Sequence, residues 1–152
     1  MSNKTCCLFG QAKINIEKQN QLYEVLYAKI ETLIKDGYAN FSFDYTGDFS
    51  FVVAMAISKL RQYYPHIKMV YYQVYDSEDT DILKYGYDEI IPPFNNIPET
   101  DTLSYRNHFM VENSDYCIFY VNTKPSNINK KALRFTKILN KPYINLYNLP
   151  KR

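Results

Sequence analysis

Short apolar runs alternate with segments of helical periodicity along the whole chain, and this alternation constrains the fold most strongly. The run Met69–Val74 is typical of a strand in a parallel sheet that is covered on both faces. Other segments place apolar residues every three or four positions, as an amphipathic helix does. One such stripe comprises Leu22, Val25, Leu26, Ile30, Leu33 and Ile34, and a second, after Gly47, comprises Val52, Met55, Ala56 and Leu60. Asp36-Gly37 supplies a stop for the first helix, and Tyr64-Pro65 ends the second.

These patterns predict a β-α-β order of elements. We predict strands at Lys4–Phe9, Phe41–Asp44, Met69–Val74, Glu89–Ile91, Tyr116–Val121 and Tyr143–Leu146. Besides the two stripes, we predict helices around Leu103–Asn113 and Lys130–Leu139. The fold class is therefore α/β: one Rossmann-like, doubly wound, mainly parallel sheet with helices on both faces. A length of 152 residues fits a single domain covering residues 1–152.

Bulk properties narrow the setting. No stretch approaches ~18 uninterrupted apolar residues, so we expect no membrane span. The start Met-Ser-Asn-Lys-Thr-Cys-Cys has no signal-peptide pattern, so we expect a cytoplasmic protein. Cys6, Cys7 and Cys117 lie in predicted core strands, where buried, reduced thiols are expected.

Charge and aromatic content bear on the partner. A net charge of +2 does not favour nucleic acid. The chain has 16 Tyr and 9 Phe but no Trp. Tyrosine suits stacking on bases and ordinary packing alike, and an AT-rich genome would produce the same bias.

In doubly wound sheets, ligands lie beyond the carboxyl ends of the strands. The loops of interest therefore follow Phe9, Asp44, Val74 and Val121. In the first loop, Gly10 permits a tight turn beside Gln11, and Lys13 can reach a phosphate. The last of these loops contains Asn122, Ser126 and Asn127, which can donate hydrogen bonds but include no glycine.

The second loop is poorly suited to phosphate. A phosphate cradle needs small residues at a helix N-terminus, and only Gly47 fits, because Asp44 and Asp48 would repel the anion. Asp48 or Ser50 can cap the next helix. Alternatively, Asp44 or Asp48 accepts hydrogen bonds from ribose or a base, with Tyr45 beside them.

Arg106-Asn107 opens the amphipathic segment before the strand at Tyr116–Val121, which puts the arginine at the rim of the sheet. Arginine binds phosphate in a bidentate manner and asparagine reads a base edge or a sugar hydroxyl, whereas a surface salt bridge is the alternative for Arg106. The histidines His66 and His108 are isolated and no Cys/His pair has ligand spacing, so we expect no metal and no cofactor.

Together these residues resemble the SLOG superfamily of Rossmann-like nucleotide-binding proteins, in the short YpsA-like branch of bacteria and their phages. The resemblance is carried by Lys4–Gly10, Phe49 after Gly47, Tyr64-Pro65, Tyr87–Pro93, Arg106-Asn107 with Met110-Val111 and Ser114-Asp115, and Ile144–Leu146. It spans nearly the whole chain, and the block from Arg106 to Asp115 is its most specific part. Arg106 matches the family's functional arginine.

The chain also departs from that family. Relatives read Gly-His-Arg at the first loop, where this chain has Gly10-Gln11-Ala12, and carry a glycine pair where Asp44-Tyr45 stand. A second glycine pair is replaced at about Asn127-Ile128, and the Glu that relatives need to cleave nucleoside monophosphates has no counterpart near Lys130–Ala132. The resemblance therefore implies binding more readily than catalysis.

We accordingly predict a non-catalytic module that senses or sequesters a nucleotide-derived small molecule, for example a phage protein that sequesters an immune signalling nucleotide. Arg106 would hold phosphate, Gly10 and Gly47 would give backbone access, and Asp44, Tyr45 and Asn107 would contact base or ribose. One alternative is a nucleotide N-glycosidase-like hydrolase that uses Asp44 or Asp48. Another is an interaction or single-strand nucleic-acid-binding protein, which the near-neutral charge disfavours. The apolar, Tyr-rich helices would allow a homodimer.

Overall fold

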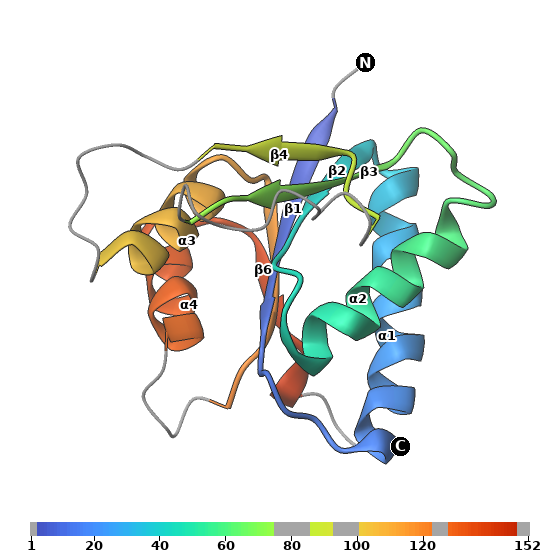
Figure 1. Cartoon of the computed structure of the whole chain (residues 1–152), viewed down its shortest axis with the longest axis horizontal. Helices are drawn as coiled ribbons and strands as arrows, with labels where there is room; N and C mark the ends of the chain where they lie inside the picture. Colours follow the sequence, from blue (N-terminus) through green and yellow to red (C-terminus); the bar gives the residue numbers. More distant parts are fainter. Residues whose placement is uncertain (1–2, 75–85, 93–100, 123–127, 149–152) are drawn as a thin grey trace.

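The structure is a computed structural model, which describes residues 3–74, 86–92, 101–122 and 128–148. Within this part the strands form one sheet in the order β4-β3-β2-β1-β5-β6, and every neighbouring pair is parallel. Strand order reverses at β1, which has β2 on one side and β5 on the other. The predicted Rossmann-like α/β architecture is confirmed (Figure 1).

All of the predicted strands are present, with small shifts at their ends. They are β1 (Lys4–Gly10), β2 (Tyr38–Ser42), β3 (Lys68–Tyr72), β4 (Glu89–Ile91), β5 (Tyr116–Tyr120) and β6 (Tyr143–Asn145). The largest shift is in β2, which begins three residues before the predicted Phe41 because Tyr38 and Ala39 already pair with β1 or pack in the core. It ends before Asp44, whose side chain instead organises the following turn.

Four helices connect the described strands: α1 (Ile16–Lys35), α2 (Gly47–Leu60), α3 (Thr102–Glu112) and α4 (Ile128–Ile138). Asn15 caps α1 by accepting a hydrogen bond from the Lys18 N–H, and Asp36 is the C-cap, just before Gly37 at φ 97°. Figure 1 shows α1 and α2 side by side on one face of the sheet, with α3 and α4 together on the other.

Each face of the sheet carries its own apolar core. The core between the sheet and α1 and α2 contains Leu26, Phe41 and Ile57, and the core between the sheet and α3 and α4 contains Val111 and Phe119. Two predicted members of the helical stripes are not in the core. Val25 is 38% exposed and Met55 is 41% exposed, because each lies at the border of its stripe rather than over the sheet.

The cysteines are buried free thiols, as predicted. Cys7 and Cys117 are direct neighbours on β1 and β5, and their sulfurs lie 3.4 Å apart. Burial raises the pKa of the Cys7 thiol well above its ordinary value, so this thiol stays protonated and donates to Cys117. In the described part of the chain, no helix combines the length and apolar character needed to cross a membrane.

Candidate functional site

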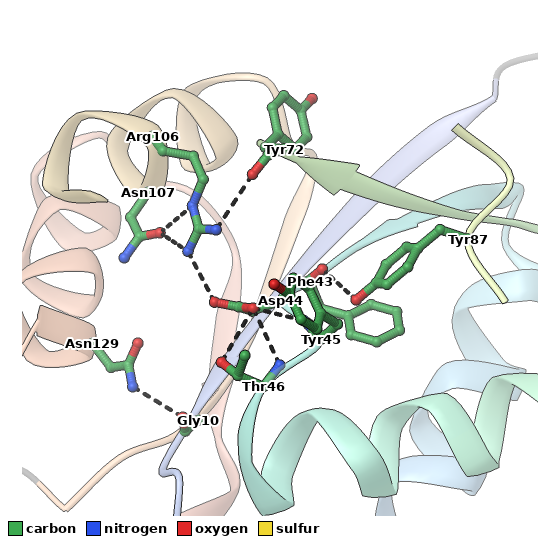
Figure 2. Close-up of polar contacts among 10 residues, drawn as sticks. All are labelled: Gly10, Phe43, Asp44, Tyr45, Thr46, Tyr72, Tyr87, Arg106, Asn107 and Asn129. Atoms are coloured by element: carbon green, nitrogen blue, oxygen red, sulfur yellow. Dashed lines mark hydrogen bonds and ion pairs between the residues drawn. The ribbon is translucent and has the colours of Figure 1, made fainter. Parts of the chain in front are cut away.

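Arg106 is the buried cation at the carboxyl ends of β2 and β3. It points from α3 toward the sheet with only 5% of its surface exposed. Its Nε and Nη2 donate to Asn107 Oδ1 at 3.1 and 2.9 Å, and Nη1 donates to the Tyr72 carbonyl at 3.3 Å. Nη2 also lies 3.4 Å from Asp44 Oδ2 (Figure 2). The guanidinium is therefore fixed on several sides rather than placed in a surface salt bridge, which was the sequence-based alternative.

Asp44, which follows β2, is the acidic partner of Arg106. One carboxylate oxygen, Oδ1, accepts hydrogen bonds from the Tyr45 N–H at 2.6 Å, the Thr46 N–H at 3.2 Å and the Thr46 hydroxyl at 3.3 Å. This is the Asx-turn arrangement, in which a carboxylate replaces a backbone acceptor. The other oxygen faces Arg106, and about one third of the side chain (34%) is exposed. Asp44 thus retains acceptor positions that a hydroxyl group can reach.

These residues border a small hollow of about 130 Å³. It is lined by Asp44, Tyr45, Thr46, Tyr71, Val74, Leu103 and Arg106. Three of the predicted ligand-binding residues, Asp44, Tyr45 and Arg106, are therefore brought together at one point. The others, where described, lie elsewhere.

Asn107 lies behind Arg106 and is only 2% exposed. Its side-chain oxygen accepts from two nitrogens of the guanidinium, and it is not among the described residues that line the hollow. In this structure Asn107 therefore orients Arg106, and its predicted contact with base or ribose stays a prediction.

Gly10 and Gly47 were expected to give a ligand access to the backbone. In this structure, close packing against neighbouring residues explains why each position is a glycine. A Cβ on Gly10 would lie 2.1 Å from Cγ of Phe49, so the phenylalanine ring covers this glycine. Gly47 has φ +91°, and a Cβ there would lie 2.9 Å from Cα of Ala12. The first N–H groups of α2 are also occupied, because Asp48 N donates to the Ala12 carbonyl at 2.8 Å and Phe49 N to the Gln11 carbonyl at 3.3 Å.

Asp48 ties this helix to the first loop. Its Oδ2 accepts from the Ile14 N–H at 2.8 Å. The sequence had indicated Asp48 or Ser50 as the cap of this helix, which is wrong, because Thr46 occupies the N-cap position and makes no side-chain cap hydrogen bond. The start of α2 is therefore engaged by protein groups in the places where a phosphate cradle would offer free N–H groups.

Gln11 and Asn122 meet where strand order reverses, between β1 and β5. Gln11 Oε1 accepts from the Asn122 N–H at 2.9 Å, and the Gln11 N–H donates to the Tyr120 carbonyl. Asn129 Nδ2 donates to the Gly10 carbonyl at 2.9 Å (Figure 2). Lys13 is exposed. Ser126 and Asn127 lie outside the described residues.

An aromatic cluster stands beside the hollow. Tyr45 packs edge-on against Tyr71, with ring centroids 5.2 Å apart, and Tyr71 contacts Tyr87 at 5.5 Å. Tyr87 also packs on Phe43 at 5.3 Å and donates its hydroxyl to the Phe43 carbonyl at 2.8 Å. Burial first, and then the nearby Asp44 carboxylate, raise the pKa of Tyr87 well above its ordinary value. The phenol therefore stays a hydrogen-bond donor.

Sequence reasoning missed four residues of the hollow: Thr46, Tyr71, Val74 and Leu103. Thr46 and Val74 lie in the segments that come after β2 and β3, so the rule that ligands lie beyond the carboxyl ends could have found them. Leu103 lies one helical turn before Arg106, on the same side of α3. Tyr71 is in the middle of an apolar strand, and no local pattern distinguishes it from ordinary core.

Chemically, the hollow offers a carboxylate acceptor, a hydroxyl and an immobilised guanidinium within an aromatic surround. Such a set can hold a polar molecule that carries both hydroxyl groups and an anionic group. Of the two candidate catalytic carboxylates, Asp44 borders the hollow, whereas Asp48 is bonded to the Ile14 N–H.

Comparison with known proteins shows the fold. No family model and no curated protein sequence matches the chain. The chain is similar in structure to DNA processing protein A from Helicobacter pylori, a protein described as binding single-stranded DNA. The TM-score is 0.64 at 13% sequence identity, and the similarity covers 98% of this chain and 66% of that one. The chain thus spans about two thirds of that protein.

A second similar structure is the molybdenum cofactor binding protein from the phototrophic bacterium Rippkaea orientalis. Its TM-score is 0.59 at 11% identity, over 94% of this chain and 76% of that one. At such low identities the likeness supports the Rossmann-like α/β fold alone, and it does so over nearly the whole chain.

Proposed function

We propose that this protein binds a nucleotide-derived small molecule without transforming it. The observation that carries the proposal is the hollow at the ends of β2 and β3, where Arg106 and Asp44 meet. The fold supports it as well, because ligands of open α/β sheets bind beyond the carboxyl ends of the strands.

The two charged side chains would have complementary roles. Arg106 would hold an anionic group such as a phosphate, and its guanidinium would lose little entropy on binding because Asn107 and the Tyr72 carbonyl already fix it. Asp44 would accept hydrogen bonds from ribose hydroxyls, because its carboxylate would repel a phosphate at close range. A ribose phosphate carries both kinds of group.

Catalysis is the weaker hypothesis. A hydrolase would need a carboxylate that activates water at the reacting bond. Asp48 is engaged by the Ile14 N–H, and Asp44 accepts from Tyr45, Thr46 and Arg106. Of Asp44 and Asp48, only Asp44 therefore remains a candidate for hydrolysis. We propose binding as the function.

The finer assignment is also a proposal. Membership in the SLOG superfamily, in its YpsA-like branch, rests on the motif resemblance from Lys4 to Leu146 together with the shared Rossmann-like fold. Sequestration of an immune signalling nucleotide by a cytoplasmic phage protein would follow from that membership and from the lost glycine motifs. A homodimer would be compatible with it.

Single-stranded DNA is a second candidate ligand. The similarity to DNA processing protein A, a protein described as binding single-stranded DNA, covers 98% of this chain. The net charge of +2 still gives little attraction to a polyanion. An oligonucleotide therefore belongs in the binding test, at two salt concentrations.

The test is retention of ligand by purified protein. The protein is incubated with AMP, ADP-ribose, cyclic ADP-ribose isomers, cyclic dinucleotides and an oligonucleotide, then filtered, and both fractions are chromatographed after heating. A compound that is retained and released intact is the expected result. New products that disappear in Asp44→Asn would instead establish an enzyme, and retention of the oligonucleotide alone would establish a DNA-binding protein.

Arg106→Ala should weaken the binding free energy of the retained ligand by about 1.5–3 kcal/mol, as expected for the loss of a charge-assisted contact. Arg134→Ala is the matched control, because Arg134 is an exposed arginine on α4. Circular dichroism must show that both variants are folded. Equal affinity of Arg106→Ala and the parent protein would remove Arg106 from the site.

A further inference from the structure

We infer that the base of this ligand lies in a second, larger hollow, an aromatic groove along α2 that adjoins the first. This inference rests on the proposed function and assigns the part of the ligand that the small hollow cannot contain. The groove has a volume of about 640 Å³, against about 130 Å³ for the hollow at Arg106. Tyr45 lines both, so the two spaces meet at this side chain.

The walls of the groove are unusually apolar for an exposed surface. On α2, Phe51 is 59% exposed and Met55 is 41% exposed, and these residues are one helical turn apart. The floor is formed by Phe43, Met69 and Tyr87, which are buried. Figure 2 shows Phe43, Tyr45 and Tyr87 gathered beside Asp44. Exposed aromatic and apolar side chains that continue into a buried aromatic floor mark a binding groove rather than scattered surface residues.

The far end of the groove is held in place by ion pairing. Arg61, just after α2, pairs with Asp88 and donates to the Gly86 carbonyl at 3.2 Å. Asp88 in turn accepts from the Met69 N–H at 2.8 Å. These contacts tie the end of α2 to β3 and to the segment that contains Tyr87. The groove is therefore formed before any ligand arrives.

Its chemistry matches a nucleobase. Flat aromatic side chains stack on any base, and the volume lies within the range of about 300–1,000 Å³ typical of small-molecule sites. Ser50, Ser58 and Gln62 add hydrogen-bonding groups for base edges, and Lys59 adds a cation toward the end of α2. At about 1.5 Å per helical residue, Ser50 and Lys59 are roughly 14 Å apart along the helix. A ligand longer than a mononucleotide fits this length.

The test uses the absence of tryptophan from the chain. Phe51→Trp places the sole tryptophan of the chain on the wall of the groove, where it can be excited selectively over the tyrosines. Ile138→Trp places it on α4 instead, where Ile138 is 68% exposed on the opposite face of the sheet. Both proteins are titrated with AMP, ADP-ribose and ribose 5-phosphate. We expect AMP and ADP-ribose to quench the emission of Phe51→Trp only, and ribose 5-phosphate to leave both proteins unchanged.

Phe51→Ser gives an independent readout by calorimetry. Loss of one stacking side chain should lower the affinity for AMP and ADP-ribose at least tenfold and leave the affinity for ribose 5-phosphate unchanged. Because Phe51 is largely exposed, the variant should fold. Arg106→Ala should weaken all three ligands, since each carries a phosphate.

The outcomes separate the two proposals. Nucleotides that bind the parent protein and Phe51→Ser equally, with no quenching, would overturn the groove assignment and leave the proposed function standing. If the groove instead joins two copies of the chain, Phe51→Ser should change the mass of the protein in size-exclusion chromatography and leave its AMP affinity unchanged. That result would also overturn the assignment. Failure of every nucleotide and of ribose 5-phosphate to bind would overturn both.

Discussion

Replacement of Gly10 by alanine should destabilise the protein through a clash with Phe49. The added Cβ would lie 2.1 Å from Cγ and 2.4 and 2.5 Å from the two Cδ atoms of the ring. Carbon atoms prefer separations of about 3.5–4.0 Å, so the overlap exceeds ~1 Å. The backbone of Gly10 is not in the left-handed region, and conformational strain therefore does not contribute.

The ring has little room to yield. Phe49 is 1% exposed in the first turn of α2, and its own N–H is bonded to the Gln11 carbonyl. Overpacking of a core costs about 1–3 kcal/mol and occasionally more. With the ring trapped at both ends, we expect a loss of about 3 kcal/mol, which is a large fraction of the roughly 5–15 kcal/mol of a typical domain. Urea unfolding followed by circular dichroism measures it as a lower midpoint at constant slope.

A double-mutant cycle isolates the cause. Phe49→Ala alone should cost about 3–5 kcal/mol for the cavity it leaves. In the Phe49→Ala background, Gly10→Ala should cost nothing or stabilise slightly, because the new methyl group enters that cavity. Two results would refute the reasoning: a loss below about 0.5 kcal/mol for Gly10→Ala in the parent protein, or the same loss in both backgrounds.

Two further predictions concern stability. Asp48→Ala leaves the Ile14 N–H without its acceptor and should lower the free energy of unfolding by about 1–3 kcal/mol, whereas Asp48→Asn, which keeps an acceptor oxygen, should recover part of the loss in urea unfolding. Burial, and more weakly Lys131, lower the pKa of His108, whose ring stacks on Phe135, while Glu112 opposes the shift. The unfolded chain then binds more protons near pH 6.5, so stability should fall as pH drops through that value, and the Tm difference between pH 5.5 and 7.5 should shrink in His108→Phe.

Periodicity predicted the fold well because local pattern and tertiary burial agree in this chain. In the run Met69–Val74, the residues from Met69 to Tyr72 are buried in β3. Each of the two stripes lies within a helix, although α1 already begins at Ile16 and α2 at Gly47. Errors occur at element boundaries. Val25 and Met55 have the correct spacing for their stripes but lie at the border of them. Burial at the border depends on the distance to the sheet, which the spacing of apolar residues does not encode.

The candidate site was harder to predict because its contacts are distant in sequence. Arg106 and Asp44 are 62 positions apart, so the ion pair that joins α3 to the turn after β2 has no local pattern. The sequence indicated that both residues lie near the carboxyl edge of the sheet, which is confirmed by their meeting there. It did not indicate that Asn107 would face Arg106, because an Arg-Asn pair on a helix surface permits either orientation.

The packing at the start of α2 and the position of the hollow are connected physically. At the start of α2, the N–H groups of Asp48 and Phe49 are bonded to loop carbonyls, and the Phe49 ring covers Gly10. A phosphate could not approach there without displacing these contacts. An anionic group in the small hollow would then depend on the charge of one side chain, Arg106, instead of on several backbone N–H groups. A backbone cradle survives most side-chain substitutions, but a site built on a single guanidinium does not, so under the proposed function we expect substitution of Arg106 to remove binding while the sheet around it is kept.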